Sequence, residues 1–143
     1  MIRGLTAPAL ALTLLALPVS AATAATQDEI NATLGGDAEL WAGLFSLAVA
    51  DQIRENCDSI EVRTLRTTAF VYDLYGQARD YGYSRREIRA FQNADATEAR
   101  MRAEVAAYFA QHGVREGEPE TYCALGLSEI AAGSQAGELL RAR

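Results

Sequence analysis

The sequence lacks lysine altogether and contains only one histidine and two cysteines. The single histidine, His112, excludes a metal site built from several histidines and leaves one candidate base for any serine or cysteine triad. The sequence also lacks G-x-S-x-G, the P-loop, H-E-x-x-H, C-x-x-C-H and the ordered EF-hand loop. We therefore assign no catalytic residue, no metal ligand and no cofactor from the sequence.

Positive charge is also scarce: 19 acidic residues stand against 13 basic ones, and the formal net charge is −6. Such a domain is not expected to bind nucleic acid, because the phosphate backbone repels it. Half of the 143 residues are hydrophobic and 22% are charged, a balance typical of folded globular proteins. The length suits a single domain.

The N-terminal 25 residues have the layout of a secretory signal peptide. Arg3 supplies positive charge, and the apolar stretch Ala9–Val19 is followed by small residues. This stretch is shorter than the roughly 20 apolar residues of a transmembrane helix. We expect a signal peptide at residues 1–25, a periplasmic or secreted domain at residues 26–143, and no stable membrane anchor after cleavage. Four alanines are candidate cleavage positions: Ala21, Ala22, Ala24 and Ala25.

The two cysteines, Cys57 and Cys123, lie 66 positions apart and allow one intramolecular pairing. Exported proteins mature in oxidising compartments, which favour a disulfide over two free thiols. A loop of this size gives about 4 kcal/mol of stabilisation in the chain-entropy model. The alternative is a redox-active pair, but such cysteines are usually close in sequence, as in C-x-x-C. We predict a structural Cys57–Cys123 disulfide.

Apolar residues recur at steps of three and four along most of the mature chain, which is the pattern of helices. No segment is a convincing strand. We predict an all-α fold, a compact bundle of about five helices, preceded by a short helical arm at residues 26–34. The predicted helices are Asp37 to Cys57, Asp58 or Ser59 to about Tyr81, Arg85 to about Asn93, Asp95 to Gly113, and Pro119 onward with a last short helix capped by Ser134.

Capping residues and glycines mark the predicted helix boundaries. Asp37 is a reasonable cap for the first helix, and Gly82 is suited to end the second. Ser84 with Glu87 has the S-x-x-E spacing of a capping box. Two further pairs have the same spacing: Asp58 with Glu61, and Asp95 with Glu98.

The second predicted helix carries two apolar stripes, which predict that other helices cover it on both sides. One stripe consists of Val62, Leu65, Ala69, Tyr72 and Gly76. The other consists of Phe70, Leu74, Ala78 and Tyr81. Near the C-terminus, Leu127 and Ile130 are expected to face the core. The glycines there favour tight packing between helices over a partner site: Gly126, Gly133 and Gly137.

Arginines and tyrosines gather around the predicted helical corner at Gly82. They could form a binding face for an anion or a glycan, with guanidinium groups beside aromatic platforms. The alternative is a solvated arginine surface next to tyrosines at the rim of the core. The candidate face consists of Arg79, Arg85, Arg86, Arg89, Tyr75 and Tyr83, with Tyr72 and Tyr81 nearby.

Three sequence features together resemble a known family. They are the segment Tyr81-Gly-Tyr-Ser-Arg-Arg-Glu-Ile, the pair Gly113-Val, and the run Cys123-Ala-Leu-Gly-Leu-Ser-Glu-Ile-Ala-Ala-Gly-Ser with Gly137 and Leu139-Leu-Arg. The chain resembles an uncharacterised family of small exported bacterial helical proteins, a domain of unknown function. The resemblance implies a helical fold and export, and it assigns no activity and no functional residues.

Three functional hypotheses follow from these observations. The first is a non-enzymatic periplasmic binding or interaction module whose partner is an envelope protein or a glycan, based on the arginine and tyrosine face. The second is a periplasmic stress chaperone, based on acidity, small size and the single disulfide. The third is a carboxylate-dependent hydrolase of cell-wall glycan, which requires two carboxyl groups about 5–10 Å apart in one cleft.

Overall fold

Helices make up most of the chain, and a short two-stranded sheet joins two distant segments. The structure is a computed structural model that describes residues 24–143. The predicted signal peptide lies outside these residues, apart from its last two positions. The elements are α1 (Gln27–Gly36), α2 (Ala38–Asn56), β1 (Ile60–Val62), α3 (Thr64–Asp80), α4 (Arg85–Gln92), α5 (Asp95–Gln111), α6 (Pro119–Ala132), α7 (Gln135–Glu138) and β2 (Leu140–Ala142).

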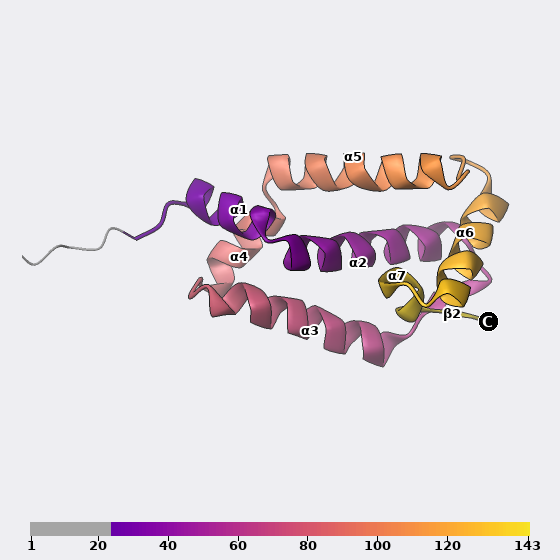
Figure 1. Ribbon diagram of the computed structural model, residues 1–143, viewed down its shortest axis with the longest axis horizontal. Helices are drawn as coiled ribbons and strands as arrows, with labels where there is room; N and C mark the ends of the chain where they lie inside the picture. The colour runs from indigo at the N-terminus through magenta and orange to yellow at the C-terminus, as the bar shows by residue number, and fades with distance from the viewer. Residues whose placement is uncertain (1–23) are drawn as a thin grey trace, which may run out of the picture.

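The long helix α2 lies at the centre of the bundle. Helix α5 runs along one side of it and α3 along the other; α1 and α4 lie at one end, and α6, α7 and the sheet lie at the other (Figure 1). Apolar residues cover most of the circumference of α2, so it can be buried against several neighbours at once. The all-α bundle is confirmed: its five main helices are α2 to α6, and the predicted arm and C-terminal piece are α1 and α7.

The core has two parts, one at each end of α2. The first joins α1, α3 and α4 to the first half of α2 through Ile30, Leu34, Leu40, Trp41, Leu74, Ala78, Ile88 and Phe91. The second joins α5, α6, α7 and the sheet to the second half of α2 through Val49, Ala50, Ile53, Cys57, Ile60, Val105, Phe109, Tyr122, Leu125, Ala136, Leu139 and Leu140. Leu47, Phe70 and Met101 pack against both parts.

Most of the predicted helix boundaries are confirmed by hydrogen bonds. Asp37 accepts from the backbone N–H groups of Glu39 and Leu40 at the start of α2. Ser84 and Glu87 form the reciprocal capping box of α4, and Gly82 has the left-handed φ of 85° that ends the preceding turn. The predicted pair Asp95 and Glu98 is wrong: Ala94 is the N-cap of α5 and makes no side-chain bond.

The segment after Cys57 is not helical, which corrects the predicted start of the second helix at Asp58 or Ser59. Helix α3 begins at Thr64, and residues 60–62 form β1, which pairs antiparallel with β2. Glu61 does not cap a helix but accepts from Arg141 at 2.7 Å and Arg143 at 3.3 Å. Both arginines follow α7 in the chain.

The prediction that other helices cover both stripes of the second helix is wrong for one of the two stripes. The stripe with Leu74 and Ala78 faces the core, but Leu65 is 89% exposed and Tyr72 is 68% exposed. No helix among residues 24–143 covers that outer face of α3, because α5 lies on the opposite side of α2 (Figure 1). In α6, Leu127 is likewise 51% exposed, contrary to expectation, while Ile130 is partly buried.

Close packing explains two of the three C-terminal glycines. A Cβ atom on Gly126 would lie 2.4 Å from Ile60 Cδ1 and 2.7 Å from Ile53 Cγ2, and one on Gly137 would lie 2.0 Å from the backbone oxygen of Glu129. Gly133 has a different role: it ends α6 with a left-handed φ of 62°. Across residues 24–143, no helix combines the length and apolarity needed to cross a membrane.

Candidate functional site

An apolar groove of about 370 Å³ lies between α2, α3 and α4. Leu44 and Leu47 of α2, Val71 of α3 and Ile88 of α4 are among its lining residues. Tyr72, Tyr75, Arg85, Arg89 and Gln92 supply its polar groups. The volume is at the lower end of the roughly 300–1,000 Å³ range of ligand pockets. An apolar surface with a few polar groups at its edge can bind a ligand or a partner segment.

Four arginines near this groove make no ion pair within the described part of the chain: Arg79, Arg85, Arg86 and Arg89. Seven other arginines each lie within 4.0 Å of a carboxylate: Arg54, Arg66, Arg100, Arg102, Arg115, Arg141 and Arg143. Arg63 donates to the backbone oxygen of Leu140. The guanidinium groups without a carboxylate partner are thus concentrated at the end of α3 and on α4, where they favour an anionic ligand.

The structure brings only part of the predicted face to the groove. Tyr75, Arg85 and Arg89 line it, whereas Arg79 and Arg86 are exposed outside it. Tyr83 stacks on Tyr81 with ring centroids 5.9 Å apart and packs against the core.

Tyr81 acts in helix packing and does not line the groove. Its hydroxyl donates to Asp37 at 2.6 Å, across from α3 to the start of α2. This hydrogen bond lowers the pKa of Asp37 and raises the pKa of Tyr81. Tyr81 therefore ties the end of α3 to the cap of α2.

A second depression lies between α1, α2 and α5, but its polar groups bond one another. Glu104 accepts from Trp41 Nε1 at 2.7 Å and from Arg100 Nε at 2.8 Å, and Arg100 also donates to the backbone oxygen of Gly35. The Arg100 guanidinium stacks 3.7 Å over the Trp41 ring. The hydrogen bond from Trp41, followed by that from Arg100, lowers the pKa of Glu104. This arrangement fastens α5 to α1 and α2 and leaves few groups for a ligand.

A third, shallow depression contains the carboxylates Asp37, Glu39 and Asp80. Asp37 is already occupied there, because Oδ1 caps α2 and Oδ2 accepts from Tyr81. The only histidine, His112, is exposed at the end of α5 and packs against the Tyr108 ring. Within residues 24–143, no three His, Cys, Asp or Glu side chains are grouped so as to hold a metal ion.

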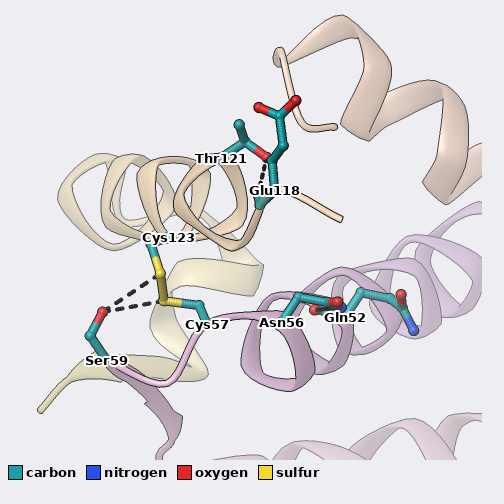
Figure 2. Close-up of a disulfide and its surroundings, with 7 residues drawn as sticks. All are labelled: Gln52, Asn56, Cys57, Ser59, Glu118, Thr121 and Cys123. Atoms are coloured by element: carbon teal, nitrogen blue, oxygen red, sulfur yellow. Dashed lines mark hydrogen bonds between the residues drawn. A yellow bond between two sulfur atoms is a disulfide. The ribbon is translucent and has the colours of Figure 1, made fainter. Parts of the chain in front are cut away.

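The predicted disulfide is present and connects the end of α2 to α6. Cys57 is the C-cap of α2, its Cα lies 5.2 Å from that of Cys123, and it is 1% exposed. The Ser59 hydroxyl lies 3.2 Å from Cys57 Sγ and donates to Cys123 Sγ at 3.7 Å, as Figure 2 shows. Cys123 is partly buried, and the bridge holds the end of α2 against α6.

One carboxylate, Glu129 of α6, is buried at 7% exposure. It accepts hydrogen bonds from the Tyr108 hydroxyl of α5 and the Ser134 hydroxyl, and Ser134 Oγ in turn accepts from the Gly137 N–H to cap α7. Buried polar groups are tolerated when they are paired in this way. The cluster joins three helices and therefore has a structural role.

This cluster predicts an unusual tyrosine titration. Burial, with the hydrogen bond to Glu129 and its negative charge, raises the pKa of Tyr108 to about 12. The folded state thus holds this proton more tightly than the unfolded state, whose tyrosines titrate near 10. The contribution to stability is present below pH 10 and is lost as pH rises through about 12. The difference in tyrosinate absorption between the wild type and Tyr108→Phe should have its midpoint near pH 12, and near 10 in urea; a midpoint near 10 in the native protein would contradict the assignment.

Sequence reasoning missed that α2 and α3 contribute most of the groove. Leu44 and Leu47 belong to the predicted helix from Asp37 to Cys57, and in the structure they line the groove together with Val71 and Tyr72. The sequence signal for an open surface on α3 was the apolar stripe that contains Leu65 and Tyr72. A helix with two apolar faces either is central or carries a surface that a partner can cover, and α3 leaves one of its two faces exposed.

These features define a small, disulfide-linked helical domain with an apolar groove. The chain belongs to the Family of unknown function (DUF5333), which it matches over residues 32–141. This confirms the resemblance to an uncharacterised domain family. No curated protein and no solved structure matches the chain.

Proposed function

We propose that this domain is a non-enzymatic binding module of the periplasm or the secreted fraction, and that the groove between α2, α3 and α4 is its binding site. The disulfide supports export, because disulfides form and persist in oxidising compartments. The apolar lining supports binding, and the groove contains no carboxylate among its lining residues. A catalytic acid pair is therefore not part of this site, which favours binding over glycan hydrolysis.

The proposal rests on one observation: arginines that lack a carboxylate partner within residues 24–143 line the groove. The chain has an excess of acidic residues, and seven arginines pair with them within 4.0 Å. Arg85 and Arg89 have no carboxylate within 4.0 Å among residues 24–143, although both line the groove. A hydrogen bond from a charged donor contributes about 1.5–3 kcal/mol, so two such groups can select an anionic partner.

Site-specific photo-crosslinking in cells that produce the chain tests the proposal. A photoreactive phenylalanine analogue replaces Tyr72 at the edge of the groove, and the matched control replaces Ala106, an exposed residue of α5 on the other side of α2. The position of Tyr72 should yield an adduct of discrete mass that Ala106 does not. In the Arg85→Ala/Arg89→Ala background its yield should fall more than tenfold, since the loss of either contact alone costs at least about 1.5 kcal/mol.

Other outcomes separate the alternatives. Identical adducts at both positions, or no adduct at the position of Tyr72, would contradict the groove as a binding site. A stress chaperone would give many adducts of different masses there, because its clients share only exposed apolar segments. Circular dichroism of each variant checks that the helices are intact.

A further inference from the structure

The apolar surface at the proposed site extends beyond the groove. Leu65, Ala69, Tyr72 and Gly76 follow one another along the outer face of α3; we call them the α3 stripe. Leu65 and Tyr72 are 89% and 68% exposed, and no atom lies within 4 Å of where a Cβ of Gly76 would be. From Leu65 to Arg79, which continues the same face, α3 rises about 20 Å. The exposed surface is thus about as long as four turns of helix.

The stripe and the groove form one continuous surface. Tyr72 belongs to the stripe and also lines the groove, together with Val71 and Tyr75 of the same helix. Leu65 lies outside the groove. A small ligand held in the groove would leave Leu65 exposed, whereas an elongated partner would cover the whole stripe.

The charges are arranged unequally along this surface. At one end, Arg66 pairs with Glu138, and Glu61 pairs with Arg141. At the other end, Arg79 and the α4 residues Arg85 and Arg89 have no carboxylate within 4.0 Å in residues 24–143. A partner that fits this surface therefore carries acidic groups at one end of an apolar face.

The backbone of the helices that line the groove determines which kind of partner segment can bind there. All three walls are helices, whose interior N–H and C=O groups bond within each helix. An extended segment would bury amide groups with no partners, and each unpaired group is costly. A helix satisfies its own backbone and presents apolar side chains at steps of three and four.

A second copy of the chain fits this surface less well. Antiparallel pairing of two α3 helices would bring the Arg79 end of one copy to the Leu65 end of the other. The carboxylates near that end, Glu61 and Glu138, already pair with arginines of their own chain. A parallel pairing would place the unpaired arginines of the two copies side by side.

We infer that the partner docks an amphipathic α-helix on the α3 stripe and into the groove, with its apolar face against α3 and its acidic residues against Arg79, Arg85 and Arg89. This inference rests on the proposed function and specifies the class of partner. The length of the stripe determines the length of the docked helix. The arginines determine at which end of that helix its acidic residues lie.

The test uses a phage-displayed library of helix-forming peptides about as long as the stripe, selected on the oxidised domain. Enriched peptides should have apolar residues three and four apart and acidic residues at one end. Fluorescence anisotropy should then show more than tenfold weaker binding of an enriched peptide to Arg85→Ala/Arg89→Ala, and a similar loss with Tyr72→Glu. Leu65→Ser should also weaken binding, because only an elongated partner reaches that residue. All of these positions are exposed, so the fold is expected to persist, and Ala106→Ser serves as the matched control.

Any of four results with peptides would overturn the inference. They are no enriched helix, enrichment of basic peptides, binding to Tyr72→Glu as strong as to the wild type, or binding to Leu65→Ser as strong as to the wild type. Dimerisation that Tyr72→Glu abolishes would also overturn it and assign the stripe to a second copy. Saturable binding of dodecanoate with no helix selected would identify a small anionic amphiphile as the occupant. That last result would leave the groove as a binding site, whereas failure of the proposed function itself appears as the absence of a Tyr72-specific adduct in cells.

Discussion

Removing the Cys57–Cys123 bridge is expected to lower the free energy of unfolding by about 4 kcal/mol. The bridge joins residues 66 positions apart, and the enclosed segment contains α3, α4 and α5. Opening that loop restores conformational freedom to the unfolded chain. A typical domain is stable by about 5–15 kcal/mol, so the loss is a large part of the total. Urea unfolding of Cys57→Ala/Cys123→Ala should show a lower midpoint and a steeper dependence on denaturant, because the open chain exposes more surface.

Two controls isolate the effect of the covalent bond. Ser59→Ala keeps the bridge and removes the hydroxyl that lies near both sulfurs, so it should cost no more than about 1.5 kcal/mol. Wild type that has been unfolded and refolded in reductant should have the midpoint of the double alanine variant. A double variant with the wild-type midpoint would mean that the bridge adds nothing to stability.

The helix boundaries could be predicted because their determinants are local. The capping box of Ser84 and Glu87, the cap at Asp37 and the left-handed Gly82 all act within a few residues of the boundary that they set. Spacing alone was insufficient at Asp95 and Glu98, because Asp95 is already the first residue of α5 and Ala94 occupies the cap. Local patterns therefore indicate where a helix begins, but only to within a residue or so.

The two strands could not be predicted because each depends on the other. β1 and β2 have three residues apiece and pair Ile60 with Ala142 and Val62 with Leu140. A segment of three residues has no periodicity that separates a strand from a helix. Asp58 and Glu61 also offered a helix cap, which the long-range pairing with the C-terminus overrode. The same long-range contact brings Arg141 to Glu61, to which its Nε donates.

For the candidate site too, the features set by neighbouring residues could be predicted, and those set by contacts between distant segments could not. The arginines near Gly82 are adjacent in sequence, so their grouping was visible before the fold was known. The groove beside them was not, because it requires α2, α3 and α4 to meet at particular angles. The α3 stripe is exposed because no other helix in residues 24–143 covers it. An apolar pattern by itself does not distinguish a covered face from a face that a partner can cover.

Helix α7 packs closely against the backbone of α6 at Gly137. We therefore expect Gly137→Ala to be the most destabilising single substitution. A Cβ atom at this position would lie 2.0 Å from the Glu129 oxygen, 2.3 Å from its carbonyl carbon and 2.7 Å from the Ile130 nitrogen. Backbone atoms inside α6 cannot shift as a side chain can, so α7 would have to move away. That movement would withdraw Leu139 and Leu140, both fully buried, and would strain the β1–β2 pairing.

We therefore expect Gly137→Ala to lower the free energy of unfolding by about 4 kcal/mol, beyond the 1–3 kcal/mol that is usual for an overfilled core. Urea unfolding measures the change, and limited proteolysis should show earlier cleavage near the C-terminus. Gln135→Ala is the matched control, because it lies in the same short helix with an exposed side chain and should change stability by less than about 0.5 kcal/mol. A Gly137→Ala protein as stable as this control would mean that α7 can be displaced without cost, and the close contact between α6 and α7 would not contribute to holding the C-terminal strand in place.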